Sequence, residues 1–242
     1  MPNPVVAKRN TLEIATLLRG EPIHLRSWVE QWNSARLVRG LVLILCGTGL
    51  YGGAMGSWRA PAQAVLVALK FPLIILLTTV GNSMLNAMLA PLLGLRLSWR
   101  QSFLAILLSF VLAAAILGSF SPLILFLVWN TPPMNATSTS GHLTYNLILL
   151  LHVAIIALAG TVANVRLARL LSDLGGSPTT ARRVLLAWLA GNLFLGSQLA
   201  WILRPFIGSP DLPVEFLRNN AFHGSFYETV FRSLLHVFAG NH

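Results

Sequence analysis

Five polar side chains lie within or beside long apolar runs, where a membrane would surround them: Lys70, Asn82, Asn86, His152 and Asn164. Asn82 and Asn86 are four residues apart and therefore share one face of a helix. Amide side chains inside a membrane usually form hydrogen bonds between helices, but the same groups could line a path for ions or small solutes. The sequence leaves both interpretations open.

Lys70 has two alternative placements with different consequences. A lysine at the middle of a membrane is costly and marks a functional site. A lysine near the interface instead extends its ammonium group to water while its stem stays in lipid. Because Lys70 directly precedes the apolar run 71–80, the sequence favours the interfacial placement.

Patterns typical of enzymes and metal sites are missing from the sequence. It has no HExxH motif, no GxSxG motif and no glycine-rich phosphate loop. His152 has no second histidine three or four residues away and Cys46 is the single cysteine, so we expect no metal site. The apolar runs contain no acidic residue, which argues against a proton pump with an intramembrane carboxylate. The sequence indicates no catalytic residue and does not identify a cofactor.

The composition identifies lipid as the solvent for much of the chain. Of its 242 residues 55% are hydrophobic and 10% are charged, and the mean hydropathy is +0.70. A soluble domain has about 25% charged residues, so much of this apolar surface must face a membrane. The net charge of +10 comes from basic residues beside the apolar runs, without a basic stripe interleaved with aromatics. We therefore expect no nucleic-acid partner.

The apolar stretches predict an all-α polytopic bundle of about five transmembrane helices. Four expected spans cover about residues 37–57, 103–129, 143–165 and 184–202. The stretch 60–94 is ambiguous, because as one helix it would be ~50 Å long while the hydrocarbon core is ~30 Å thick. It could be an interfacial segment at 61–69, a joint at 70–72 and a crossing at 71–93. It could also be one tilted, kinked helix with a break at Gly81-Asn82.

The arginines predict the orientation. With five spans, three groups fall on one side of the membrane: Arg36 and Arg39; Arg96 and Arg100; and Arg166, Arg169, Arg182 and Arg183. The other side has Arg59 near the first span and no arginine in 130–142. The positive-inside rule then places the N-terminus in the cytoplasm and the C-terminal tail outside. We expect an integral protein of a bacterial inner membrane.

Polar segments flank the bundle, which we place at residues 37–204. Residues 1–36 contain a short amphipathic helix in which Trp28 and Trp32 share a face. This face would lie either in the headgroup layer or against the protein's own cytoplasmic surface.

Residues 205–242 form an external tail. Arg204 and Arg218 are its basic anchors, and Asp211 and Glu215 are the acids closest to them in the sequence. We expect these four residues to hold the tail against the bundle. Apolar side chains must contribute more, because an exposed ion pair gives only ~0–1 kcal/mol.

Glycines in the first span predict close helix packing. Gly49 and Gly53 are four residues apart, as are Gly52 and Gly56. This spacing lets two helices approach closely in a membrane. We expect Gly49, Gly53 and Gly56 to form a packing or oligomer interface.

Two segments carry a resemblance to known proteins. LYGGAMGSW (50–58) and ALKFP (68–72) resemble multi-pass membrane proteins of the Yip type, a broad family with a cytoplasmic N-terminus and about five spans. WILRPFIGSPDLPVEFLR (201–218) is similar to a tail of uncharacterised bacterial membrane proteins. The Yip-type resemblance implies a protein that organises membranes or binds partners. It transfers no functional residue to this chain.

The sequence favours a non-enzymatic membrane scaffold or a subunit of a larger membrane assembly. Its expected partners are the lipid bilayer and either other membrane subunits or further copies of the chain. The first alternative is an ion channel or small-solute transporter, whose path the five polar side chains would line. The second alternative is an intramembrane enzyme.

Overall fold

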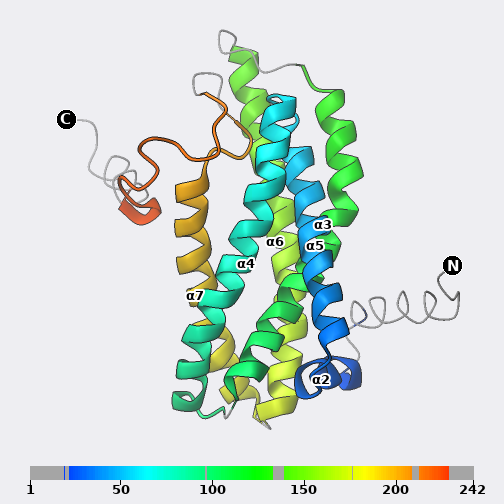
Figure 1. The fold of residues 1–242 in the computed structure, drawn as a ribbon, viewed down its shortest axis with the longest axis vertical. Helices are drawn as coiled ribbons and strands as arrows, with labels where there is room; N and C mark the ends of the chain where they lie inside the picture. Colours follow the sequence, from blue (N-terminus) through cyan, green and yellow to red (C-terminus); the bar gives the residue numbers. More distant parts are fainter. Residues whose placement is uncertain are drawn as a thin grey trace, which may run out of the picture.

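Long helices dominate the part of the chain that the structure describes. The structure is a computed structural model and describes residues 19, 22–95, 97–132, 139–175, 177–208 and 213–228. A short helix α2 (Pro22–Glu30) precedes α3 (Ser34–Gly56), α4 (Pro61–Leu92), α5 (Trp99–Trp129), α6 (Thr139–Gly175) and α7 (Pro178–Leu203). Successive long helices run in opposite directions along one bundle, and α2 lies at the end where α3 begins (Figure 1).

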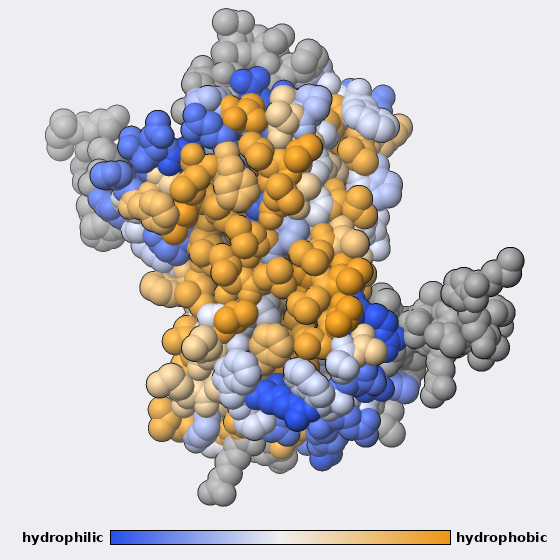
Figure 2. Space-filling view, in the orientation of Figure 1, coloured by the Kyte–Doolittle hydropathy of each residue, from blue (hydrophilic) through white to orange (hydrophobic). Residues whose placement is uncertain are grey.

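The prediction of an all-α polytopic bundle is confirmed. Among the described residues, five helices are long and apolar enough to cross a membrane, namely α3 to α7. Apolar side chains form a band across the middle of the bundle, and hydrophilic side chains gather towards its two ends (Figure 2). This arrangement is what a bilayer requires, because its hydrocarbon core cannot hydrate polar groups.

Local sequence signals start several of these helices. The Asn33 side chain accepts a hydrogen bond from the Arg36 backbone at 3.2 Å and caps α3. Ser98 and Gln101 form a reciprocal capping box at the start of α5. Pro61 and Pro178 occupy first-turn positions of α4 and α7, where proline loses no helical hydrogen bond.

The structure shows the ambiguous stretch 60–94 as a single helix, and other spans extend beyond their predicted limits. Residues 60–94 do not divide at Lys70-Phe71-Pro72 or break at Gly81-Asn82, because α4 runs without interruption for 32 residues. Pro72 lies inside this helix, and membrane helices tolerate such prolines when neighbouring helices support them. α6 extends to Gly175, so Arg166 and Arg169 belong to its last turns and not to a loop. α7 begins at Pro178, so Arg182 and Arg183 belong to its first turns.

The packing core is formed by α3, α4 and α5, while α7 lies at the edge of the bundle against α4 and α6 (Figure 1). In the most apolar stretch of α5, 56% of the residues are buried, compared with 6% in α7. α7 therefore gains little from packing and depends more on the specific contacts that it makes.

Glycines allow α3 to touch two neighbouring helices at the backbone. A methyl group added at Gly52 would lie 2.7 Å from the Val67 carbonyl oxygen of α4, and one at Gly56 would lie 2.7 Å from the Gln63 carbonyl oxygen. A methyl group at Gly47 would overlap the Ala114 carbonyl oxygen of α5. These distances are too short for any side chain, so the three positions require glycine.

The predicted glycine interface is only partly the observed one. Gly56 lies in the close contact with α4. An added methyl group at Gly49 would lie 3.3 Å from the Ala68 carbonyl oxygen, and one at Gly53 would lie 3.6 Å from the Ala68 side chain. Gly52 and Gly47 are in tighter contact than either, because the register with α4 and α5 selects the face.

The short helix α2 packs on the protein, which decides between the two placements left open above. Leu25, Trp28 and Val29 are buried where α2 contacts α5 and α6. Trp32, which follows α2, is 47% exposed, and the Arg100 guanidinium lies 4.4 Å from the centre of its ring. This cation–π contact links the N-terminal segment to the start of α5.

Candidate functional site

α4 carries buried polar side chains along most of its length: Gln63, Lys70, Thr78, Thr79, Asn82, Ser83 and Asn86. Thr78, Asn82 and Asn86 are four residues apart, which places these three in one row on the helix. A polar group buried in a membrane protein costs free energy unless it is hydrogen-bonded. The hydrogen-bond partners of these side chains therefore show which parts of the protein they hold together.

In the middle of the bundle, this row joins α4 to α7. The Asn82 amide donates hydrogen bonds to the Asn192 side-chain oxygen and, at 3.2 Å, to the Trp188 carbonyl. Asn86 donates to the Asn82 side-chain oxygen at 2.7 Å. A methyl group at Gly191 would overlap the Asn82 carboxamide, so glycine makes room for it. These hydrogen bonds attach α7, which is otherwise poorly buried, to α4.

Nearer the start of α4, Gln63 and Lys70 contact the segment that follows α7. The Lys70 side chain is fully buried, and its ammonium group donates to the Glu215 carbonyl oxygen at 2.9 Å. Gln63 donates to the Pro205 and Phe206 carbonyl oxygens at 2.9 and 3.1 Å. Lys70 thus differs from a lysine that extends freely to water, because the C-terminal segment covers it.

The contacts of the C-terminal segment also differ from the predicted ion pairs. Glu215 contacts Lys70 through its backbone carbonyl, and no described acidic side chain pairs with Arg204 or Arg218. Asp211 lies outside the described residues. The Arg204 guanidinium lies against the Trp201 ring. Burial lowers the pKa of Arg204, and the positive charge of Arg218 lowers it further.

A buried tyrosine–histidine pair joins α3 to α6. The Tyr51 hydroxyl and His152 Nδ1 are 2.8 Å apart, and the two rings meet edge to face at 5.5 Å. The sequence interpretation gave His152 no partner. Its need for a polar group at matching depth in another helix was a usable signal, since Tyr51 carries a hydroxyl within the first span.

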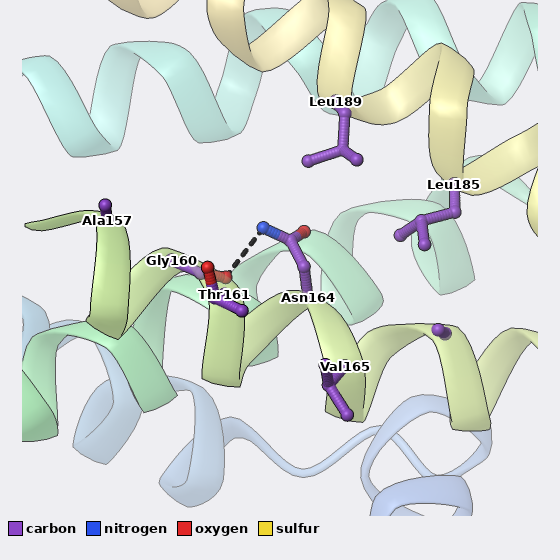
Figure 3. Close-up of a pocket in the computed structure, with 8 residues that line it drawn as sticks. Ala157, Gly160, Thr161, Asn164, Val165, Leu185 and Leu189 are labelled. Atoms are coloured by element: carbon purple, nitrogen blue, oxygen red, sulfur yellow. Dashed lines mark hydrogen bonds between the residues drawn. The ribbon is translucent and has the colours of Figure 1, made fainter.

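An open groove lies between parts of α6 and α7 (Figure 3). Its volume is about 460 Å³, and it is lined by Ala157, Gly160, Thr161, Asn164, Val165, Ala168, Leu185 and Leu189. Asn164 donates to the Gly160 carbonyl oxygen at 2.7 Å, and its carboxamide lies towards the α7 side of the groove. The lining is otherwise small or apolar.

The five polar residues singled out in the sequence do not form one site. Asn82 and Asn86 contact each other, Lys70 contacts the C-terminal segment, His152 contacts Tyr51, and Asn164 lies in the groove. Within the described part of the chain, no group of three or more His, Cys, Asp or Glu side chains is placed to hold a metal ion. Lys70, Asn82 and His152 thus hold helices and the C-terminal segment together.

Comparison of the chain with known protein families, curated proteins and solved structures finds no match. The resemblance to Yip-type proteins therefore stays a prediction.

Proposed function

We propose that this protein is a non-enzymatic subunit of a larger membrane assembly, and that the groove between α6 and α7 receives a transmembrane helix of a partner. The position of the Asn164 side chain supports this proposal most directly. Its carboxamide lies in an open groove at the membrane-spanning part of α6, whose span Leu147–Leu174 has its midpoint beside Gly160.

An amide that faces lipid is unfavourable, and a polar side chain on a neighbouring helix relieves the cost. Asn164 uses one amide hydrogen within its own helix, and its oxygen accepts no hydrogen bond from the described residues. A methyl group at Gly160 would meet nothing within 4 Å, so a helix has room to approach there. The occupant we propose is a transmembrane helix with small residues and a hydrogen-bond donor at the depth of Asn164.

The alternative of a channel or transporter has weaker support. Asn82 and Asn86 hydrogen-bond to each other and to α7, and the C-terminal segment covers Lys70. These side chains are engaged in holding the fold. Flux of ions through liposomes that contain the purified chain alone would favour the alternative.

A photo-reactive side chain at Thr161 should cross-link to a protein in native membranes, because Thr161 is exposed within the groove. The same group at Val65 of α4, which is 63% exposed outside the groove, is the control and should react mainly with lipid. Asn164→Leu should abolish the Thr161 product. A product of twice the mass of the chain would identify the occupant as a second copy. Lipid adducts alone at Thr161 would contradict the proposal.

We also propose that the protein lies in a bacterial inner membrane with its N-terminal segment in the cytoplasm. Support comes from the described arginines at the end of the bundle that contains α2: Arg36, Arg39, Arg100, Arg166, Arg169, Arg182 and Arg183. An excess of arginine next to spans is typical of the cytoplasmic side.

Cysteine labelling checks this orientation. In a Cys46→Ala background, an impermeant thiol reagent added to intact cells should modify Ser225→Cys in the C-terminal segment. It should leave Ser177→Cys, between α6 and α7, unmodified until the cells are opened. Labelling of Ser177→Cys in intact cells would reverse the orientation.

A further inference from the structure

Three cations from distant parts of the sequence converge where α4 begins and α7 ends. Lys70 lies in α4, Arg204 directly follows α7, and Arg218 belongs to the C-terminal segment. The Lys70 ammonium group contacts the Glu215 backbone at 2.9 Å, three residues before Arg218, and Gln63, seven residues earlier in α4, contacts the Pro205 backbone next to Arg204 at 2.9 Å. The positive charge of Arg218 also lowers the pKa of Arg204. Such a cluster is electrostatically unfavourable unless something of opposite charge accompanies it.

The described contacts do not neutralise this cluster. Lys70 meets a neutral carbonyl oxygen of Glu215 and lies 5.6 Å from the centre of the Phe216 ring. Nε and Nη2 of Arg218 and Nη1 of Arg204 are buried and have no hydrogen-bond partner. A buried guanidinium N–H group without an acceptor is costly, so these donors indicate a missing acceptor.

We propose that Lys70, Arg204 and Arg218 form a binding site for a phosphate group. A phosphate offers several acceptor oxygens and negative charge in a compact tetrahedron. Guanidinium groups bind such oxygens through paired N–H donors, and an ammonium group adds a point charge. One bound phosphate would satisfy the orphaned donors and compensate the mutual repulsion of the three side chains.

The depth of the site is compatible with a lipid headgroup as well as with free phosphate. Lys70 is nine residues into α4, ~13 Å from the helix start, and α4 exceeds a ~30 Å hydrocarbon core by ~18 Å. With α4 centred in the bilayer, Lys70 lies within ~5 Å of the core boundary. Arg204 follows the last residue of its span. Both sources offer the same chemistry, a phosphate oxyanion.

The test measures thermal unfolding of the full-length chain in neutral detergent. Sodium phosphate is compared with sodium chloride at equal ionic strength, and phosphatidylglycerol is compared with phosphatidylcholine. At least one of the two phosphate sources should raise the midpoint temperature of the wild type, because a ligand that binds only the folded state stabilises it. A response to phosphatidylglycerol alone identifies a headgroup site, and a response to sodium phosphate identifies a site for free phosphate.

Arg218→Gln should weaken the response about tenfold or more in phosphate or lipid concentration, because a charge-assisted hydrogen bond is lost. Arg204→Gln serves the same purpose if Arg218→Gln does not fold. Arg183→Gln, at the opposite end of the bundle, is the control for general charge and should respond like the wild type. Asp211→Asn should respond at least as strongly as the wild type, since it removes a negative charge from the same segment.

Two results would overturn the proposal. The first is a wild type that responds to neither phosphate source, whether or not Asp211→Asn responds. The second is an Arg218→Gln variant with an undiminished response.

Discussion

Replacing Gly52 by alanine is expected to lower the free energy of unfolding by about 1–3 kcal/mol, the usual range for overpacking a core. The added methyl group would lie 2.7 Å from the Val67 carbonyl oxygen and 3.0 Å from Phe71 Cβ. Since a backbone oxygen cannot rotate away, α3 and α4 must move apart. The effect should exceed that of most surface substitutions.

Gly53→Ala is the matched control, because it makes the same chemical change one residue along the same helix. Its methyl group would lie 3.6 Å from Ala68 Cβ, which is ordinary van der Waals contact. Alanine also favours a helix over glycine by roughly 0.5–1 kcal/mol, so Gly53→Ala should be neutral or stabilising. Unfolding in detergent followed by circular dichroism measures both variants. Equal losses of stability would contradict the packing of α3 on α4.

Replacing Asn82 by leucine is expected to cost about 1–2 kcal/mol and to loosen α7. The change removes the hydrogen bonds to Asn192 and Trp188 and leaves Asn86 without its acceptor. Single hydrogen bonds between membrane helices contribute ~0.6 kcal/mol on average, and Asn82 makes several. Because α7 is the least buried span, its amide hydrogens should exchange faster in the variant.

A double-mutant cycle with Asn192→Leu isolates the contact between the two asparagines. The two substitutions together should cost less than their sum, since each removes the same hydrogen bond. Additive losses, together with unchanged hydrogen exchange in α7, would show that the asparagines do not connect these helices.

The sequence predicts what depends on composition and on local signals. Apolar runs and arginines predict a five-span bundle, because a bilayer demands about 20 apolar residues per crossing. The extent of α4 could not be predicted in this way, because Lys70 and Pro72 suggest a helix boundary, whereas the structure shows one continuous helix supported by its neighbours.

Contacts between distant residues explain what the sequence interpretation missed. Two overlapping four-residue glycine spacings are present in α3, and only the register with Val67 and Ala114 selects Gly52 and Gly47. Tyr51 and His152 are 101 residues apart, so nothing local pairs them. The C-terminal segment is bound through backbone carbonyl oxygens, which every residue has and no side-chain pattern reveals.

The mass of the protein extracted from its native membrane in mild detergent tests the central claim most directly. Native mass spectrometry should find the 26.3 kDa chain in a complex with another membrane subunit, and Asn164→Leu should release that subunit while the chain stays folded. A wild-type chain that is recovered as a monomer with lipid alone would contradict the account of this protein as an assembly subunit.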